Sequence, residues 1–143
     1  PLGLAARAES RASAVHLETL RVGRGDSEER RRVWIQPEDD VPHVRDRVRR
    51  LAESVGLQPA QIAAASAFTA AAAQVLDSAD LLLCSAAQAR ELGLYWRPMG
   101  GIDPVRGYAV AAADGEDAER IERDLAEGLA RCLGASGDEE VRR

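Results

Sequence analysis

Residues 58–99, QPAQIAAASAFTAAAAQVLDSADLLLCSAAQARELGLYWRPM, decide the fold of this chain. Apolar runs of strand length alternate here with segments whose apolar residues recur at helical spacing. The predicted order is strand Gln61–Ala65, helix Ser66–Leu76, strand Asp80–Cys84, helix Ser85–Gly93 and strand Leu94–Trp96. Because two helices link three short strands, we expect parallel strands joined by right-handed crossovers. This βαβαβ unit is the predicted centre of the domain.

Capping residues mark where these helices are expected to begin and end. Ser66 is a good N-cap residue, and Phe68 follows it on an apolar helical face. Ser85 and Gln88 have the spacing of a capping box, in which each side chain satisfies a backbone donor of the other residue. Gly93 is placed to end the second helix. The apolar run that ends at Cys84 is typical of a strand covered on both faces.

The remaining chain adds elements on both sides of this unit. Further strands are expected at Leu2–Arg7, Val33–Gln36 and Tyr108–Ala113, and Val15–Leu20 is either a strand or a helical turn. A helix that ends at Gly56 is expected to have Asp39 or Asp40 as its N-cap and Pro42 in its first turn. A last helix, Gly115–Leu133, is capped by Asp114. The prediction is a three-layer α/β domain with a mostly parallel sheet, followed by a flexible tail over residues 135–143.

Composition limits the classes of function. The chain of 143 residues is 45% apolar and 30% charged, as in a soluble globular domain. Its net charge of −5 argues against general nucleic-acid binding. No apolar run approaches the roughly 18 residues of a membrane span, and no signal peptide is visible. Cys84 and Cys132 are predicted to be buried thiols in a reducing cytosol, without a disulfide or a metal.

No catalytic or phosphate-binding motif is present, so we do not expect an enzyme. The sequence lacks G-x-G-x-x-G, a P-loop, G-x-S-x-G and H-E-x-x-H. The two histidines, His16 and His43, are predicted at a surface turn and in the first turn of a helix. The RGD triplet within the charged connection GRGDSEERRR is interpreted as a chance match in a solvated loop.

Binding chemistry is expected at one edge of the sheet. In parallel α/β sheets, ligands lie beyond the carboxyl ends of the strands and against helix N-termini. The predicted effector-binding residues all follow a parallel strand and are Gln36, Ser66, Phe68, Thr69 and Ser85. Backbone N–H, hydroxyl and amide groups suit a small polar or anionic molecule there. The plainer alternatives are that Ser66 and Ser85 only cap helices and that Phe68 fills the core.

The segments that carry a family resemblance cover nearly the whole chain and are VWIQP, DRVRRLAESVGL, IAAASAFTAAAAQVLDSADLLLCS, LGLYWRPM and RGYAVAAADGEDAERIERDLAEGL. Taken in this order, they resemble the C-terminal half of LysR-type transcriptional regulators. The resemblance implies one subdomain of a type 2 periplasmic-binding-protein fold, spanning residues 1–134, that senses a small effector. It further implies a cytoplasmic, dimerising protein without a cofactor or a membrane. DNA binding would reside in a domain absent from this chain.

Two features follow from the resemblance, and two alternatives remain. The Ile121, Leu125 and Leu129 stripe of the last helix is expected to pack on a neighbouring chain or on an exposed sheet face. The ligand edge is expected to be half of a cleft, so that the chain alone binds no small molecule tightly. A stand-alone small-molecule-binding module and a small α/β enzyme are the alternatives to a regulator.

Overall fold

The structure is a computed structural model that describes residues 1–22 and 30–132. Its contacts divide the chain into two units, Pro1–Arg106 and a second that begins at Gly107, and each is described by itself. The RGD triplet and the predicted tail at residues 135–143 lie outside the described residues. No described helix is both long and apolar enough to cross a bilayer.

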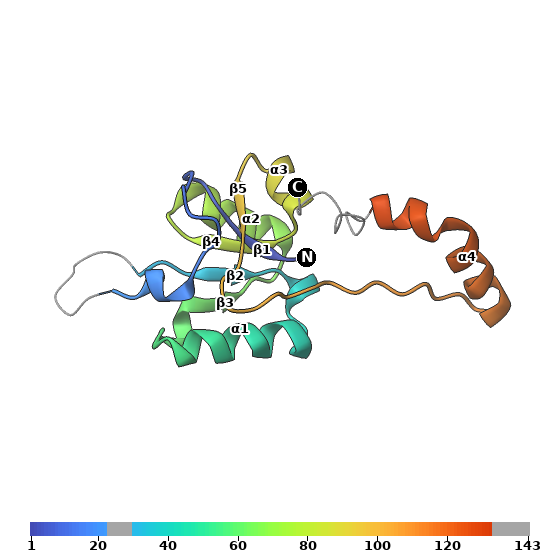
Figure 1. Cartoon of the computed structure of the whole chain (residues 1–143), viewed down its shortest axis with the longest axis horizontal. Coiled ribbons are helices and arrows are strands. Elements are labelled where there is room, and N and C mark those ends of the chain that lie inside the picture. Colours follow the sequence, from blue (N-terminus) through green and yellow to red (C-terminus); the bar gives the residue numbers. More distant parts are fainter. Residues whose placement is uncertain (23–29, 133–143) are drawn as a thin grey trace. The chain divides into compact units, whose positions relative to one another are not determined.

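A five-stranded sheet forms the centre of the first unit (Figure 1). The strands are β1 (Gly3–Ala6), β2 (Val33–Ile35), β3 (Ile62–Ala64), β4 (Leu81–Cys84) and β5 (Tyr95–Pro98). Their order is β3-β2-β4-β1-β5. β2 pairs in parallel with β3 and with β4, whereas β1 pairs antiparallel with β4 and with β5. Four strands therefore share one direction and β1 opposes them, which confirms the mostly parallel sheet.

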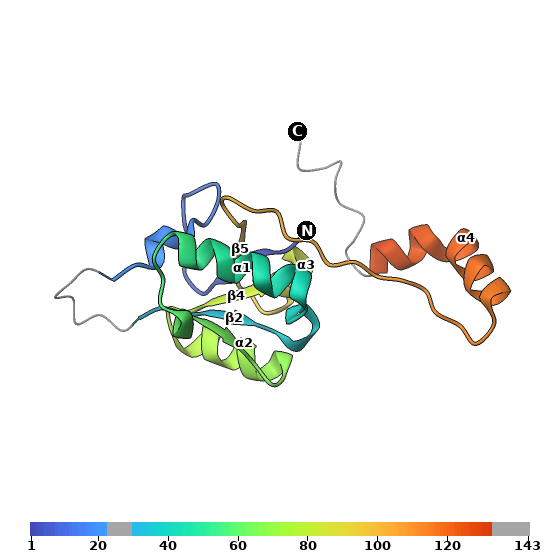
Figure 2. The same cartoon turned by 90° about the horizontal axis from the view of Figure 1, so that it is seen from below.

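Helices cover both faces of this sheet, which confirms the three layers (Figure 2). One face packs against α1 (Pro42–Ser54) and the 3-10 turn η1 (Leu17–Leu20). The other face packs against α2 (Phe68–Asp77) and α3 (Ala86–Glu91). Two further 3-10 turns, η2 (Pro37–Asp39) and η3 (Pro59–Gln61), lie before α1 and β3.

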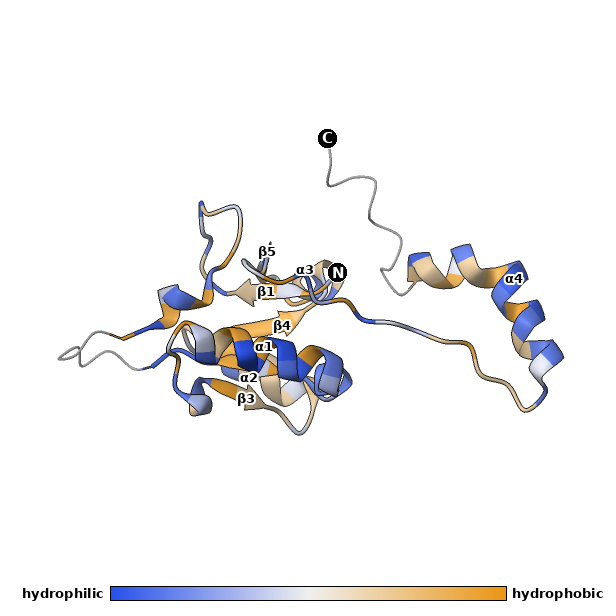
Figure 3. Ribbon diagram, turned by 60° about the horizontal axis from the view of Figure 1, so that its bottom comes forward, coloured by the Kyte–Doolittle hydropathy of each residue, from blue (hydrophilic) through white to orange (hydrophobic). Residues whose placement is uncertain are grey.

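The apolar run of β4 is explained by these two layers. Leu81 and Leu83 lie in the core on the α1 side, and Leu82 and Cys84 lie in the core on the α2 side. All four are at most 1% exposed, and β4 is accordingly hydrophobic over its length in Figure 3. Because successive strand residues point to opposite faces, a strand buried on both faces has no polar position.

Two predicted helix N-caps are wrong. α1 begins at Pro42 as expected, but its N-cap is Val41, and no side chain caps it. Asp39 lies in η2 and is fully buried, where it pairs with Arg106 and does not cap α1. α2 begins two residues after Ser66, with Ala67 as an uncapped N-cap. In contrast, the Ser85–Gln88 capping box at the start of α3 is confirmed.

The cysteine prediction is correct for one residue and wrong for the other. Both Cys84 and Cys132 are free thiols; Cys84 is buried, and Cys132 is exposed.

The segment Val15–Leu20 was predicted to be a strand or a helical turn, and the structure contains a part of each. Leu17–Leu20 is a 3-10 turn, and Val15 makes an isolated bridge to Met99.

The second unit contains one helix, α4 (Gly115–Cys132), among its described residues. Asp114 accepts a hydrogen bond from the N–H of Glu116 at 2.9 Å, which confirms the predicted cap. No described residue of α4 is buried. The strand predicted at Tyr108–Ala113 is wrong, because this segment carries no strand assignment and pairs with no described strand.

Candidate functional site

The carboxyl ends of β2, β3 and β4 meet at one edge of the sheet. Ile35 is in register with Ala64 of β3 and with Leu83 of β4. Gln36, Ser66 and Ser85 follow these strand ends directly or within two residues, so they emerge at the same edge. The N–H of Ala65 donates to the carbonyl of Ile35 at 2.9 Å and extends the pairing of β3 toward this edge.

The five predicted effector residues occupy different environments along this edge. Ser66 and Thr69 are exposed, Phe68 is half-buried against the α2-side core, and Ser85 is half-buried as the N-cap of α3. Gln36 is fully buried. The structure connects Gln36 to Ser85 through Gln88, and their role in effector binding stays a prediction.

Gln36 and Gln88 join two strand ends by reciprocal hydrogen bonds. Gln36 Nε2 donates to Gln88 Oε1 at 3.2 Å, and Gln88 Nε2 donates to Gln36 Oε1 at 3.1 Å. Gln36 Nε2 also reaches the carbonyl of Leu83 at 3.2 Å. Gln88 Oε1 accepts from the N–H of Ser85 at 3.2 Å, which completes the capping box. The amide of Gln88 therefore links the end of β2 to the start of α3.

A buried ion pair lies at the centre of this network. Arg106 donates from Nε to Asp39 Oδ1 at 2.8 Å and from Nη2 to Asp39 Oδ2 at 2.7 Å. Asp39 is 0% exposed, and the side chain of Arg106 is 14% exposed. Breaking such a buried pair by removing one partner typically costs about 3–5 kcal/mol, because the remaining charge is left uncompensated. We call Gln36, Asp39, Gln88 and Arg106 the edge network.

Further bonds complete the edge network. Gln36 Nε2 donates to Asp39 Oδ2 at 2.9 Å, and Arg106 Nη2 donates to Gln88 Oε1 at 3.2 Å. The exposed carboxylate of Glu38 lies 3.3 Å from Arg106 Nη1. Among the described residues, no buried side-chain nitrogen or oxygen lacks a hydrogen-bond partner. Because its buried polar atoms all have partners, the network makes this edge of the sheet rigid.

Sequence reasoning missed Asp39 and Arg106 as parts of this edge. The sequence predicts Asp39 as a helix cap, because it precedes α1 within an acidic triplet. Arg106 lies 67 residues further along the chain, and no local pattern relates the two. Gln88 was found through its capping-box spacing.

Cys84 lies beneath this edge as an inert thiol. Burial raises the pKa of Cys84 to about 12, and the negative charge of Asp39 adds to the increase. Because the thiolate is the reactive form, a thiol with so high a pKa is a poor nucleophile at neutral pH. Among the described residues, no group of three or more His, Cys, Asp and Glu side chains is arranged to hold a metal.

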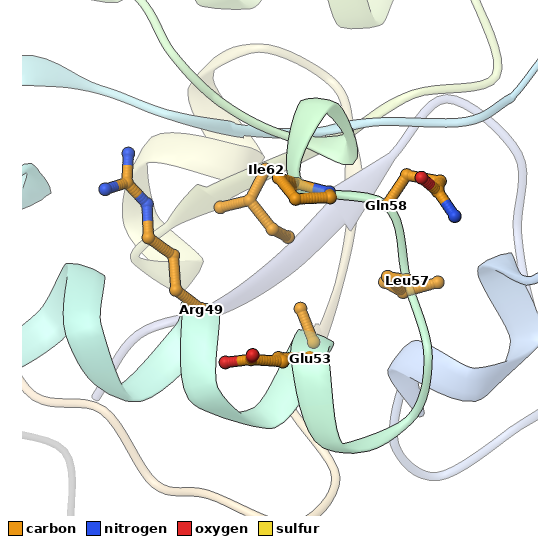
Figure 4. A pocket seen from close by; sticks show the side chains of 7 residues that line it. Arg49, Glu53, Leu57, Gln58 and Ile62 are labelled. Carbon is orange, nitrogen blue, oxygen red and sulfur yellow. The ribbon is translucent and has the colours of Figure 1, made fainter.

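A hollow of about 620 Å³ lies away from the edge network, where α1 ends and β3 begins. Ala52, Leu57, Pro59 and Ile62 form its apolar part. Arg49, Glu53 and Gln58 complete its lining, and Figure 4 shows that the guanidinium of Arg49 extends away from the Glu53 carboxylate. Ile62 is the first residue of β3, so the hollow is at the amino end of that strand. None of the predicted effector residues lines it.

Comparison with known proteins supplies one relative, whereas no family model matches the chain. Over 138 residues the chain is 53% identical to the HTH-type transcriptional regulator BlaA of Streptomyces cacaoi. This chain is similar to a transcriptional regulator. The match covers 96% of this chain but only 42% of the regulator. The chain thus spans less than half the length of its relative.

Proposed function

We propose that this chain is the ligand-sensing part of a LysR-type DNA-binding transcription factor. The observation that carries the proposal is the 53% identity to a helix-turn-helix regulator over almost the whole chain. The three-layer fold with one opposed strand supports it, because this architecture suits one subdomain of a periplasmic-binding-protein-like effector domain. The name of the relative also supports regulation rather than enzymatic catalysis.

Division of labour between segments is part of the same proposal. The chain corresponds to 42% of the regulator, which leaves room for a helix-turn-helix and a first effector subdomain elsewhere in a longer protein. The net charge of −5 supports placing DNA contacts outside residues 1–143. We place the full-length protein in the cytoplasm, without a cofactor and without a membrane association.

The effector is proposed to bind at the edge formed by the carboxyl ends of β2, β3 and β4. The exposed Ser66 and Thr69 offer hydroxyl groups, and Ser85 lies at the first turn of α3. Such groups suit a small polar or anionic molecule. Because a ligand pocket usually encloses most of its ligand, the opposite wall belongs to the rest of the protein, and the chain alone binds weakly.

Oligomerisation is proposed to use the apolar stripe of α4. Leu125 is 54% exposed and Leu129 is 36% exposed in the described structure. Two leucines one helical turn apart, with Ile121 one turn earlier, form a stripe that favours burial against another protein surface. The partner surface is proposed to belong to the same regulator, as a homo-oligomer or as the first effector subdomain.

The reading frame that precedes the codon of Pro1 tests this proposal. The proposal predicts that this frame continues upstream and encodes a helix-turn-helix. A signal peptide there would instead indicate a secreted binding module. A start codon directly at this position would contradict the assignment to a DNA-binding regulator.

A further inference from the structure

We propose that the Asp39–Arg106 ion pair is a latch. It couples the proposed effector edge to the exit segment, residues 104–106, by which the chain leaves the first unit. This inference rests on the proposed function, since it concerns the regulation of the same edge. It assigns to Arg106 the role of a positioning residue, which acts on the edge through Gln88 and on the exit segment through its own backbone.

The position of Arg106 in the chain is the first observation. Arg106 is the last residue of the first unit, and Gly107 begins the second. The exit segment is also held two residues earlier, where the N–H of Leu2 donates to the carbonyl of Pro104 at 2.8 Å. The chain therefore leaves the sheet between two fixed points, one on the start of β1 and one on Asp39.

The position of Asp39 and Gln88 is the second observation. Asp39 follows β2 and Gln88 lies in the first turn of α3, so both belong to the predicted effector edge. Arg106 Nη2 contacts both side chains, at 2.7 Å and 3.2 Å. A ligand that draws the side-chain amide of Gln88 toward itself changes the hydrogen bond from Arg106 Nη2 to Gln88 Oε1.

Burial of Asp39 makes the contact between Arg106 and the edge costly to break. A carboxylate that is 0% exposed has no water to replace a lost guanidinium. The network consequently opens as a unit or stays closed, because a half-open state leaves a buried charge without its partner. Coupling between two sites is reciprocal, so loosening the exit segment must loosen the edge, and the reverse.

Amide hydrogen exchange on the 143-residue chain tests the latch, with the Gln88 N–H as the reporter of the edge and the Leu2 N–H as the reporter of the exit segment. The Gln88 N–H donates to Ser85 Oγ at 3.2 Å, and the Leu2 N–H donates to Pro104 O. In Arg106→Gln we expect both amides to exchange on the order of 100-fold faster, relative to amides of β4. In Gln88→Ala we expect the Leu2 amide to accelerate as well, although Leu2 is remote from Gln88 in sequence.

Arg45→Gln is the matched control. Arg45 pairs with Asp40 at 3.4 Å and with Asp46 at 3.2 Å, beside the same acidic segment, but all three side chains are partly exposed to water. Its loss should leave the Gln88 and Leu2 amides within about threefold of the wild type, since surface pairs contribute little. An Arg106→Gln protein in which only the exit segment accelerates would overturn the latch.

A measurement on the unmodified chain decides the matter if Arg106→Gln does not fold. In native-state exchange at low denaturant, the latch predicts that the Gln88 and Leu2 amides share one opening free energy and one denaturant slope. Different values for the two amides would overturn it. These results are independent of the upstream reading frame, so the latch and the proposed function can fail separately.

Discussion

Replacing Gly3 by alanine is expected to destabilise the first unit, because β1 has no room for a side chain at this position. Gly3 is in register with Cys84 on one side and with Pro98 on the other. A Cβ built on Gly3 would lie 2.6 Å from two atoms of the Trp96 indole, and closer still to the carbonyl oxygen of Arg97. That oxygen belongs to the backbone of the neighbouring strand, so it cannot rotate away.

Two opposed effects set the change in the free energy of unfolding for Gly3→Ala. Alanine restricts the unfolded chain and thereby stabilises by about 0.4–1 kcal/mol. Overpacking a filled site costs about 1–3 kcal/mol. Trp96 cannot move without loss either, because its Nε1 donates to the carbonyl of Cys84 at 3.0 Å. We therefore expect a net loss of about 1–2 kcal/mol in the free energy of unfolding.

Urea unfolding followed by tryptophan fluorescence measures this loss, since Trp34 and Trp96 both belong to the first unit. Gly107→Ala is the matched control, because a Cβ at Gly107 meets nothing within 4 Å. The control should leave the transition within about 0.5 kcal/mol of the wild type. A Gly3→Ala protein as stable as the wild type would refute the close approach of β1 and β5.

Three further outcomes are expected. Leu82→Ala should cost about 2–5 kcal/mol, since Leu82 is 0% exposed in the middle of β4, and calorimetry measures the loss. Ser85→Ala should cost about 0.5–2 kcal/mol through the loss of its cap, whereas the exposed Ser66→Ala should be neutral in the same unfolding assay. A thiol reagent should modify Cys132 at once and Cys84 only after unfolding. Because the pKa of Cys84 is raised from 9.0 to about 12, its contribution to stability is complete below pH 9 and is lost as the pH rises toward 12, which unfolding curves across that range would detect.

Local patterns predicted those parts of the fold that depend on local chemistry. The apolar run of β4 required burial on both faces, and the structure confirms it with Leu82 on one side and Leu83 on the other. The Ser85 capping box was correct because both partners lie within one turn. Ser66 failed as a cap because the chain stays extended through Ala67 before α2 begins.

Polar contacts between residues far apart in the chain leave no local sequence pattern. Asp39 looked like a helix cap, and only the folded chain brings it to Arg106. The segment Tyr108–Ala113 has the composition of a strand, but a strand needs a neighbour with which to pair, and the described residues provide none. The common edge of Gln36, Ser66 and Ser85 was predictable from topology, whereas the partners of the buried Gln36 side chain, Asp39 and Gln88, were not.

DNA footprinting with the full-length gene product tests the central claim most directly. The account predicts that the full-length protein protects a specific DNA site and that residues 1–143 alone protect none at the same concentration, because the proposed function assigns DNA binding to a segment outside them. Specific protection by the 143-residue chain itself, or no protection by the complete protein at any promoter of its own locus, would contradict the account.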